Sequence, residues 1–313
     1  MFSAVVFAYS EVGQRCLQVL LDAGVQVPLV FTHADQAGEQ RWFGSVADLA
    51  AAKGVRTVMP VAPAAPEWLA EIGRIRPDYL LAFYYRSLLP RQLLQLPRWG
   101  ALNMHGSLLP RYRGRAPVNW AIANGETQTG ATLHYMVARP DAGPIVAQEA
   151  VAIGPNDHAL AVSMAVAGAA AHVLRRTLPG MALGPPPGVP MDIAAGSYFG
   201  GRRPEDGCIR LDWPGMRVHN MIRAVAPPFP GAYVQIADRR VGFVSSRLSG
   251  EPARHPAAAP CLYATDDQLF MDCRDGVRLL LGRVLIDGTE LDGREFQTRF
   301  GVAPWRFNFT ARD

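Results

Sequence analysis

The sequence predicts an α/β protein with a Rossmann-like, mostly parallel sheet that has helices on both faces, followed by a small OB-like β-barrel domain. Two observations carry this prediction. In the first half of the chain, short apolar runs alternate with helical patterns of roughly 10–15 residues, which is typical of βαβ units. Beyond about residue 200 the pattern changes to short strands separated by Gly, Pro and Asp, which is typical of a small barrel or sandwich.

The strands and helices of the first half follow from the apolar period and from the residues that begin and end helices. The expected strands are residues 5–8, 25–31, 55–59, 78–83 and 101–104. The expected helices between them are residues 11–23, 45–53, 66–76 and 90–96. Ser45 is a suitable N-cap, and Gly24 and Gly54 follow the ends of two helices. Strands joined through helices give a parallel sheet covered on both faces.

The second half of the chain contains a predicted change of domain type, marked by a proline-rich stretch. Expected helices are residues 116–124 and 157–177, and expected strands are residues 130–137, 144–153, 232–236, 241–246, 268–272 and 277–286. Residues 184–190 (GPPPGVP) can neither hold a helix nor donate to a sheet, so they predict a linker. The predicted domains are therefore residues 1–183, a linker at 184–200, and the barrel at 201–313.

Composition and charge exclude several classes of protein. No apolar run reaches the roughly 18–20 residues that span a bilayer, and the first residues lack the basic leader of a signal peptide, so a cytoplasmic location is expected. The net charge of +4 is spread along the chain, so no nucleic-acid partner is expected. The four cysteines form no C-x-x-C pair, which favours reduced thiols over disulfides or a zinc site. The first strand-to-helix turn lacks G-x-G-x-x-G, which argues against a dinucleotide.

One strand end carries polar residues in an unusual pattern. The apolar strand at residues 101–104 leads into His105, and Asn103 lies two positions before it, so both side chains face the same way. Asn can donate a hydrogen bond to a developing oxyanion, and His can exchange a proton near neutral pH. The structural alternative is a buried Asn–His pair that binds backbone groups of a loop.

Two further polar features accompany this strand end. Arg111, Arg113 and Arg115 follow in one loop, where they offer groups for an anion or form an ordinary solvated surface. Asp141 lies in a short turn between two expected strands, where it either takes part in a site or binds its own backbone. Spacing alone does not bring Asp141 to the Asn–His pair.

These segments together resemble the folate-dependent formyltransferase family. The stretch from Asn103 to Gly114 (NMHGSLLPRYRG) is similar to that family's central loop, and residues 141–143 (DAG) to its downstream acidic turn. The resemblance covers nearly the whole chain, including the small C-terminal barrel. Within the family, the chain is most similar to the formyltransferase domain of the bifunctional polymyxin-resistance enzyme. The matching stretches are residues 5–9, 31–35, 82–86, 119–126, 221–225 and 230–232.

The resemblance implies a reaction and a set of site residues. It implies transfer of a formyl group from 10-formyltetrahydrofolate to the amine of a nucleotide-linked amino sugar, with no metal required. Asn103 and protonated His105 would stabilise the negative charge on the formyl oxygen, and Asp141 would keep His105 charged. The folate site would be lined by Ser87, Leu88, Leu89, Arg115, Val137, Ala138, Arg139, Pro140 and Asp141.

The substrate implied by the nearest resemblance is UDP-4-amino-4-deoxy-L-arabinose, which links the chain to lipid A modification and polymyxin resistance. A separate decarboxylating dehydrogenase is then expected in the same pathway, because the chain stops at Asp313. Three alternatives stay open: methionyl-tRNA formyltransferase, formylation of another nucleotide amino sugar, and a non-catalytic folate-binding paralogue. The loop at residues 35–44, with two acids and one Arg, is a poor surface for tRNA. Residues 300–308 match nothing with a known role.

Overall fold

The computed structural model describes residues 2–35, 41–236, 239–255 and 259–307. The chain divides into two compact units. The first unit contains Met1–Pro117, Gln128–Ala152 and Ser163–Gly200, and the second contains Val118–Thr127, Ile153–Val162 and Gly201–Asp313. Two segments of the N-terminal half thus pack with the C-terminal part of the chain.

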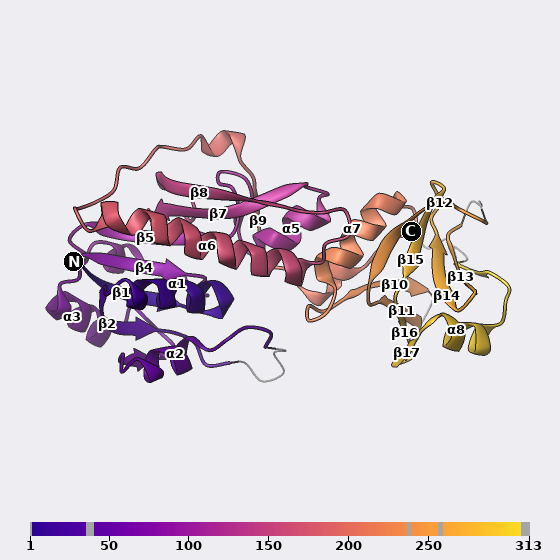
Figure 1. Ribbon diagram of the computed structural model, residues 1–313, viewed down its shortest axis with the longest axis horizontal. Helices are drawn as coiled ribbons and strands as arrows, with labels where there is room; N and C mark the ends of the chain where they lie inside the picture. Colours follow the sequence, from indigo (N-terminus) through magenta and orange to yellow (C-terminus); the bar gives the residue numbers. More distant parts are fainter. Residues whose placement is uncertain (1, 36–40, 237–238, 256–258, 308–313) are drawn as a thin grey trace. The chain divides into compact units, whose positions relative to one another are not determined.

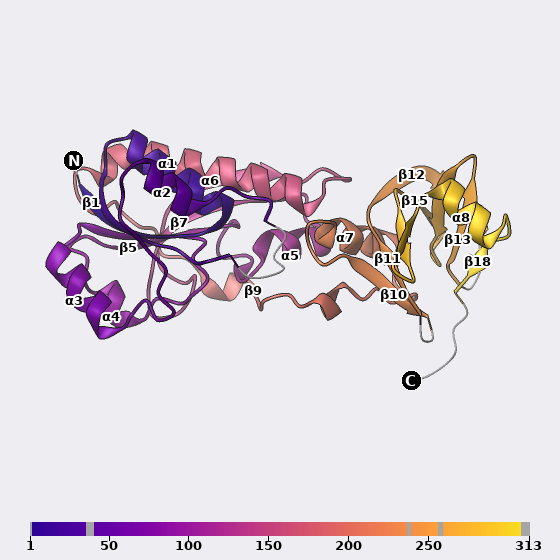
Figure 2. The same cartoon turned by 90° about the horizontal axis from the view of Figure 1, so that it is seen from below.

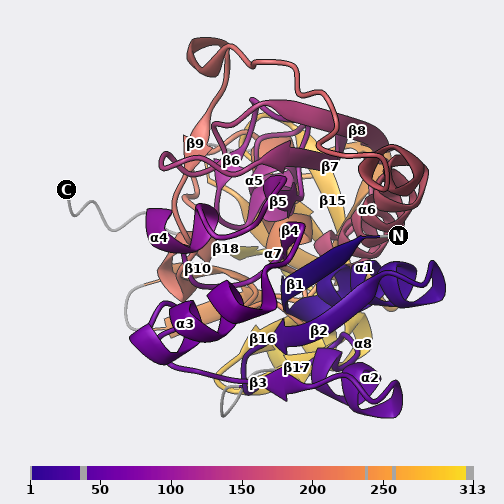
Figure 3. The same cartoon turned by 90° about the vertical axis from the view of Figure 1, so that its left-hand side faces the viewer.

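A mixed seven-stranded sheet forms the centre of the first unit, in the order β3-β2-β1-β4-β5-β7-β8 (Figure 3). The strands are β1 (Ser3–Ala8), β2 (Gln26–Phe31), β3 (Thr57–Val58), β4 (Tyr79–Phe83), β5 (Gly100–His105), β7 (Gln128–Tyr135) and β8 (Ile145–Ala152). Strands β1 to β5 are parallel to one another, whereas β7 is antiparallel to both β5 and β8. The prediction of a mostly parallel sheet is confirmed.

Helices cover both faces of this sheet, as expected from the βαβ pattern. They are α1 (Ser10–Asp22), α2 (Val46–Ala52), α3 (Pro66–Ile75), α4 (Arg91–Leu94) and α6 (Ala159–Met181). Figure 2 shows α1, α2 and α6 on one face and α3 and α4 on the other. On the second face, Phe7 and Phe31 stack with ring centroids 4.3 Å apart, and Trp68 of α3 packs edge-on against Phe31. This apolar core fixes the strands whose ends carry the polar residues.

The stretch after α6 belongs to the first unit and is bonded to the rest of that unit at two places. Val189 exchanges two backbone hydrogen bonds with Ile145, each 2.8 Å from nitrogen to oxygen. Further on, β9 (Tyr198–Phe199) pairs in parallel with β6 (Arg113–Gly114). The prediction that residues 184–190 donate nothing to a sheet is wrong at Val189. Unlike the prolines around it, this residue has a backbone N–H that can donate.

The second unit is rich in antiparallel strands, as the change of pattern after residue 200 indicates (Figure 1). A four-stranded sheet contains β10 (Ala232–Ile236), β11 (Arg239–Phe243), β16 (Val284–Ile286) and β17 (Thr289–Leu291). A five-stranded sheet contains β12 (Ser246–Pro252), β15 (Val277–Leu281), β14 (Gln268–Asp272), β13 (Cys261–Thr265) and β18 (Trp305–Arg306). The remaining α-helices of the described residues are α5 (Pro117–Ala123), α7 (Gly215–Val225) and α8 (Gly293–Phe300).

Most predicted elements lie within a few residues of the observed ones, and the differences have physical causes. Residues 277–286 form two strands, β15 and β16, because the chain leaves one sheet for the other at Gly282. Helix α7 was not predicted, because its buried residues include the polar His219 and Arg223 among apolar ones. His219 is bonded there to Ser246 Oγ and to the Pro155 carbonyl, both at 2.8 Å. Such polar residues interrupt the apolar period on which the prediction depends.

Candidate active site

The polar residues at the end of β5 meet their neighbours through the register of the sheet. β5 pairs with β7 so that Asn103 lies opposite His134 and His105 lies opposite Thr132. Residues directly opposite in an antiparallel pair present their side chains on the same face. Asn103 and His105 therefore share a face with two polar residues of β7, as the spacing of two along β5 predicts.

Asp141 reaches this face from the turn between β7 and β8. Its Oδ1 lies 3.6 Å from His105 Nδ1 and 3.5 Å from Asn103 Nδ2. Its Oδ2 accepts a hydrogen bond of 2.9 Å from the backbone N–H of Gly114. The structure thus brings together the three residues that the resemblance grouped, although Asp141 is distant from the other two in sequence. Asp141 adopts a left-handed backbone with φ of 50°, which a short polar side chain tolerates.

His105 is buried, and its two ring nitrogens have different partners. Nε2 donates a hydrogen bond of 2.8 Å to the carbonyl of Tyr112, because a carbonyl oxygen can only accept. Nδ1 is therefore the nitrogen that faces Asp141 and is available to exchange a proton. The loop after β5 is held by Thr132, whose hydroxyl donates to the Ser107 carbonyl at 2.6 Å and accepts from the Leu109 N–H at 3.2 Å.

Burial and the neighbouring groups have opposite effects on the pKa values of this cluster. Burial lowers the pKa of His105, against the raising effects of Asp141 and of the Tyr112 carbonyl. Burial raises the pKa of Asp141, but the nearby His105, His134 and the Gly114 N–H together bring it down to about 2. Asp141 thus favours the charged form of His105, as expected, but the lost hydration of the buried imidazolium outweighs this attraction, so the net pKa of His105 lies below its ordinary value.

Apart from Arg115, the residues expected to line a folate site lie in two segments of the first unit, residues 87–89 and 137–141. Leu88 is 78% exposed and Val137 is 42% exposed, which are high fractions for apolar side chains. Leu89, in contrast, packs partly against the apolar core. Ser87, Pro140 and Asp141 are partly buried, and Ala138 and Arg139 are exposed. The two segments thus offer apolar surface and backbone groups to a ligand.

The three arginines of the loop after β5 have different environments. Arg111 and Arg115 are exposed, and the Arg115 backbone N–H donates to the Phe199 carbonyl at 3.0 Å. Arg113 is buried, and its Nε and Nη1 have no hydrogen-bond partner. The run is therefore neither a single solvated surface nor a single anion site.

His134 belongs to the cluster but was not predicted from the sequence. Its Nε2 lies 3.1 Å from Asn103 Nδ2 and 3.6 Å from Asp141 Oδ1. A signal was present, because Thr132 and His134 alternate along the expected strand at residues 130–137 as Asn103 and His105 do along β5. Finding it required the pairing register of the two strands, which the sequence does not state.

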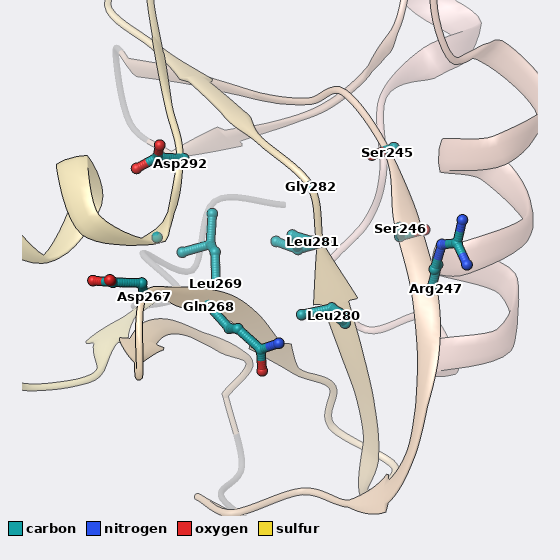
Figure 4. A pocket seen from close by; sticks show the side chains of 11 residues that line it. Ser245, Ser246, Arg247, Asp267, Gln268, Leu269, Leu280, Leu281, Gly282 and Asp292 are labelled. Atoms are coloured by element: carbon teal, nitrogen blue, oxygen red, sulfur yellow. The ribbon is translucent and has the colours of Figure 1, made fainter.

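A separate cavity of about 220 Å³ lies in the second unit (Figure 4). It is lined by Ser245, Ser246, Arg247, Asp267, Gln268, Leu269, Leu280, Leu281, Gly282, Asp292 and Gly293. None of the predicted site residues lines it.

Among the residues that the structure describes, no group of three or more His, Cys, Asp or Glu side chains is arranged to hold a metal ion. No described helix has the length and apolar character needed to cross a bilayer.

Several solved structures share the fold of this chain. An N-formyltransferase from Helicobacter canadensis, solved with folinic acid and dTDP-3-aminofucose, is 17% identical, with a TM-score of 0.69 over 90% of this chain and 99% of that one. WlaRD, a sugar 3N-formyl transferase solved with dTDP and 5-N-formyl-THF, is 18% identical, with a TM-score of 0.68 over 90% and 97%. HypX from Aquifex aeolicus, solved with tetrahydrofolic acid, is 17% identical, with a TM-score of 0.64 over 96% of this chain and 48% of that one.

Family models match most of the chain. Residues 4–178 match the model described as formyl transferase, and residues 202–301 match the model of the formyl transferase C-terminal domain. The first match contains Asn103, His105, Asp141 and all other residues of the site described above. The chain belongs to the formyl transferase family.

Proposed function

We propose that this protein transfers a formyl group from 10-formyltetrahydrofolate to the primary amine of a nucleotide-linked amino sugar. The contact of Asn103, His105 and Asp141 at the carboxyl end of β5 carries the proposal. Formyl transfer to an amine needs a donor to the formyl oxygen and a group that moves a proton, and this cluster provides both. Catalysis is assigned to residues 1–183, with residues 184–200 as connection and 201–313 as the C-terminal domain.

Each residue of the cluster has one step in this chemistry. 10-Formyltetrahydrofolate supplies the electrophilic formyl carbon. Asn103 donates an N–H to the formyl oxygen as that oxygen gains negative charge. His105 Nδ1, neutral and facing Asp141, takes the proton of the amine as the new C–N bond forms. The imidazolium, held between Asp141 and the Tyr112 carbonyl, then gives this proton to the folate nitrogen as its bond to the formyl carbon breaks.

The surroundings of the cluster suit a folate. A pterin ring needs apolar cover and backbone donors and acceptors, and ligand sites combine these features. Leu88 and Val137 present apolar side chains to solvent in the two segments concerned. Arg115, which follows β6 in the chain, is exposed, and its guanidinium suits the carboxylates of the folate tail. Three structurally similar proteins were solved with folinic acid, 5-N-formyl-THF and tetrahydrofolic acid, which supports this assignment.

We further propose UDP-4-amino-4-deoxy-L-arabinose as the acceptor, in the cytoplasm, as part of lipid A modification and polymyxin resistance. The support is the resemblance of residues 82–86 and 119–126 to the formyltransferase domain of the bifunctional enzyme. Two of the structural neighbours were solved with dTDP or a dTDP-amino sugar, which makes dTDP-linked amino sugars the comparison to test.

The test is a panel of UDP- and dTDP-linked amino sugars incubated with 10-formyltetrahydrofolate and the full chain. Mass spectrometry of the products should show a gain of one formyl group for UDP-4-amino-4-deoxy-L-arabinose, faster than for any other member. Faster formylation of a dTDP-linked sugar would reject the arabinose acceptor and keep the reaction class. No formylation of any member would reject the proposed function.

A further inference from the structure

We propose that His134 is a positioning residue that holds the side-chain amide of Asn103 with its nitrogen turned toward the reacting formyl oxygen. This inference rests on the function proposed above, because it gives Asn103 the part of donor to that oxygen. His134 is only 1% exposed and lies directly opposite Asn103 in the register of β5 and β7. The proposal concerns which end of the amide faces the substrate.

The hydrogen bonds of His134 determine which of its nitrogens carries the proton. Nδ1 lies 2.8 Å from the carbonyl oxygen of Tyr135. A carbonyl can only accept, so Nδ1 must carry a proton and donate it. In the neutral ring, Nε2 then has a free lone pair and can only accept.

That lone pair determines the orientation of Asn103. The amide nitrogen of Asn103 lies 3.1 Å from Nε2 and is the nearer of the two groups that face it, since Asp141 Oδ1 lies 3.6 Å away. The amide must therefore donate one N–H to Nε2. If the amide were reversed, its oxygen would face a lone pair in a buried setting, and both acceptors would be left unsatisfied.

The second N–H of Asn103 is the one left for the substrate. Asp141 Oδ1 is an acceptor for it, at a distance of 3.5 Å from the amide nitrogen. This contact is at the long limit of a hydrogen bond, so a formyl oxygen bound nearby can replace it. His134 thus selects the donor end of Asn103, and Asp141 leaves the second donor available.

Substitutions of His134 separate this role from a general structural one. His134→Gln keeps an acceptor near the position of Nε2, and His134→Asn is too short to keep it. We expect His134→Asn to lower kcat by about 10- to 100-fold, less than the roughly 100- to 1,000-fold typical for loss of an oxyanion donor itself. KM for 10-formyltetrahydrofolate should stay within about threefold, and His134→Gln should recover most of kcat. Equal losses in both variants would overturn the proposal.

A double-mutant cycle with Asn103→Ala gives the decisive comparison. If His134 acts through Asn103, His134→Asn should change kcat by less than about twofold once Asn103 is Ala, because residues that act as a unit are not additive. Full multiplication of the two single effects would overturn the proposal. Circular dichroism and thermal unfolding of every variant confirm that the comparison is made on folded protein.

A readout without turnover tests the same arrangement. Nitrogen-15 NMR of histidine-labelled full-length protein should show His134 as the neutral tautomer with its proton on Nδ1, assigned by its disappearance in His134→Gln. A proton on Nε2, or a charged ring at pH 7.5, would overturn the proposal. If the unmodified protein formylated no amine at all, the proposed function would fail, while this spectrum would still decide the arrangement of His134.

Discussion

The partner of each ring nitrogen decides what a histidine at the end of β5 or β7 can do. His105 donates from Nε2 to Tyr112, so its proton exchange passes through Nδ1 beside Asp141. His134 donates from Nδ1 to Tyr135, so its Nε2 accepts from Asn103. Two histidines on one face of the sheet thus have opposite tautomers in their neutral forms, and therefore separate parts in the proposed reaction.

Removal of the proton-transfer groups should abolish most turnover. We expect His105→Asn and Asp141→Asn each to lower kcat by about 100- to 10,000-fold, the usual contribution of general acid–base catalysis, with folate binding retained. Steady-state kinetics and equilibrium titration with folinic acid measure the two effects. The matched controls are His172→Asn and Asp22→Asn. The native His172 side chain is 59% exposed, and the native Asp22 carboxylate accepts a hydrogen bond from Gln18 at the surface. Near-normal turnover in either site variant would remove its residue from the mechanism.

The depressed pKa of Asp141 makes a prediction about stability. Its pKa of about 2 in the folded protein lies below the ordinary value of 3.8, so the folded state favours the ionised carboxylate. The stabilisation is fully present above about pH 4 and is lost as the pH falls toward 2. The difference in unfolding free energy between the unmodified protein and Asp141→Asn should therefore grow by about 2 kcal/mol from pH 2 to pH 5. Urea denaturation across this range measures it, and a flat difference would contradict the assignment.

The lowered pKa of His105 has the opposite consequence for charge. Because burial disfavours the imidazolium, neutral His105 predominates at pH 7, and protonation occurs only below the ordinary value of 6.5. If the neutral ring takes the proton of the amine, kcat/KM should be level near pH 7 and fall on acidification below about pH 6.5. A pH–rate profile checks this, and an activity that rises on acidification through that range would contradict it.

At the scale of elements, the short pair β6–β9 positions the partner of Asp141. Gly114 has φ of 97°, and a Cβ at this position would meet the carbonyl oxygen of Phe199 in β9. Its N–H is the group that Asp141 Oδ2 binds. Any other residue at position 114 would thus strain the backbone. It would also displace the N–H that donates to the Asp141 carboxylate.

Gly114→Ala should therefore destabilise the protein by about 1–3 kcal/mol and lower kcat as well, because strained backbone positions cost that much. Thermal and urea unfolding measure the first effect. Gly73→Ala in α3 is the matched control, because no atom lies within 4 Å of its added Cβ and its φ is not positive. The control should raise stability by up to about 1 kcal/mol, since Ala favours a helix over Gly. Equal behaviour of the two variants would contradict this account of Gly114.

The elements also show where sequence reasoning succeeds and where it stops. Strands such as β4 and β10 were found almost to the residue, because an apolar run bounded by turn residues determines them locally. Helix α7 was missed, because His219 and Arg223 are buried through hydrogen bonds to distant parts of the chain. Likewise, Asn103 and His105 followed from one strand, whereas His134 depended on pairing between two strands. What is local in sequence was predictable, and what depends on register was not.

At the scale of the whole molecule, the distribution of charge bears on whether a tRNA can be the substrate. The chain has 31 basic and 27 acidic residues, and Lys53 is its single lysine. The loop at residues 35–44, of which 36–40 lie outside the described residues, contains Asp35 paired with Arg41 at 2.9 Å. This loop therefore offers few cations for a polynucleotide backbone.

Binding of tRNA should consequently be weak and non-specific, with Kd in the range of about 10⁻⁴ to 10⁻⁶ M at physiological salt. A gel-shift or anisotropy titration with methionyl initiator tRNA and uncharged tRNA measures it. Nanomolar affinity for the charged initiator, with a steep dependence on salt, would instead favour a methionyl-tRNA formyltransferase.

The register between β5 and β7 also limits how this protein can change in length. Asn103 meets His134 and His105 meets Thr132 only while the two strands keep their present alignment. Insertion of a single residue within β7 would turn the polar side chains beyond it to the other face of the sheet. Leu133 would then take the place of Thr132 or His134 on the face of the site. Homologous chains are therefore expected to gain or lose residues in the connecting loops, while these two strands vary only by substitution.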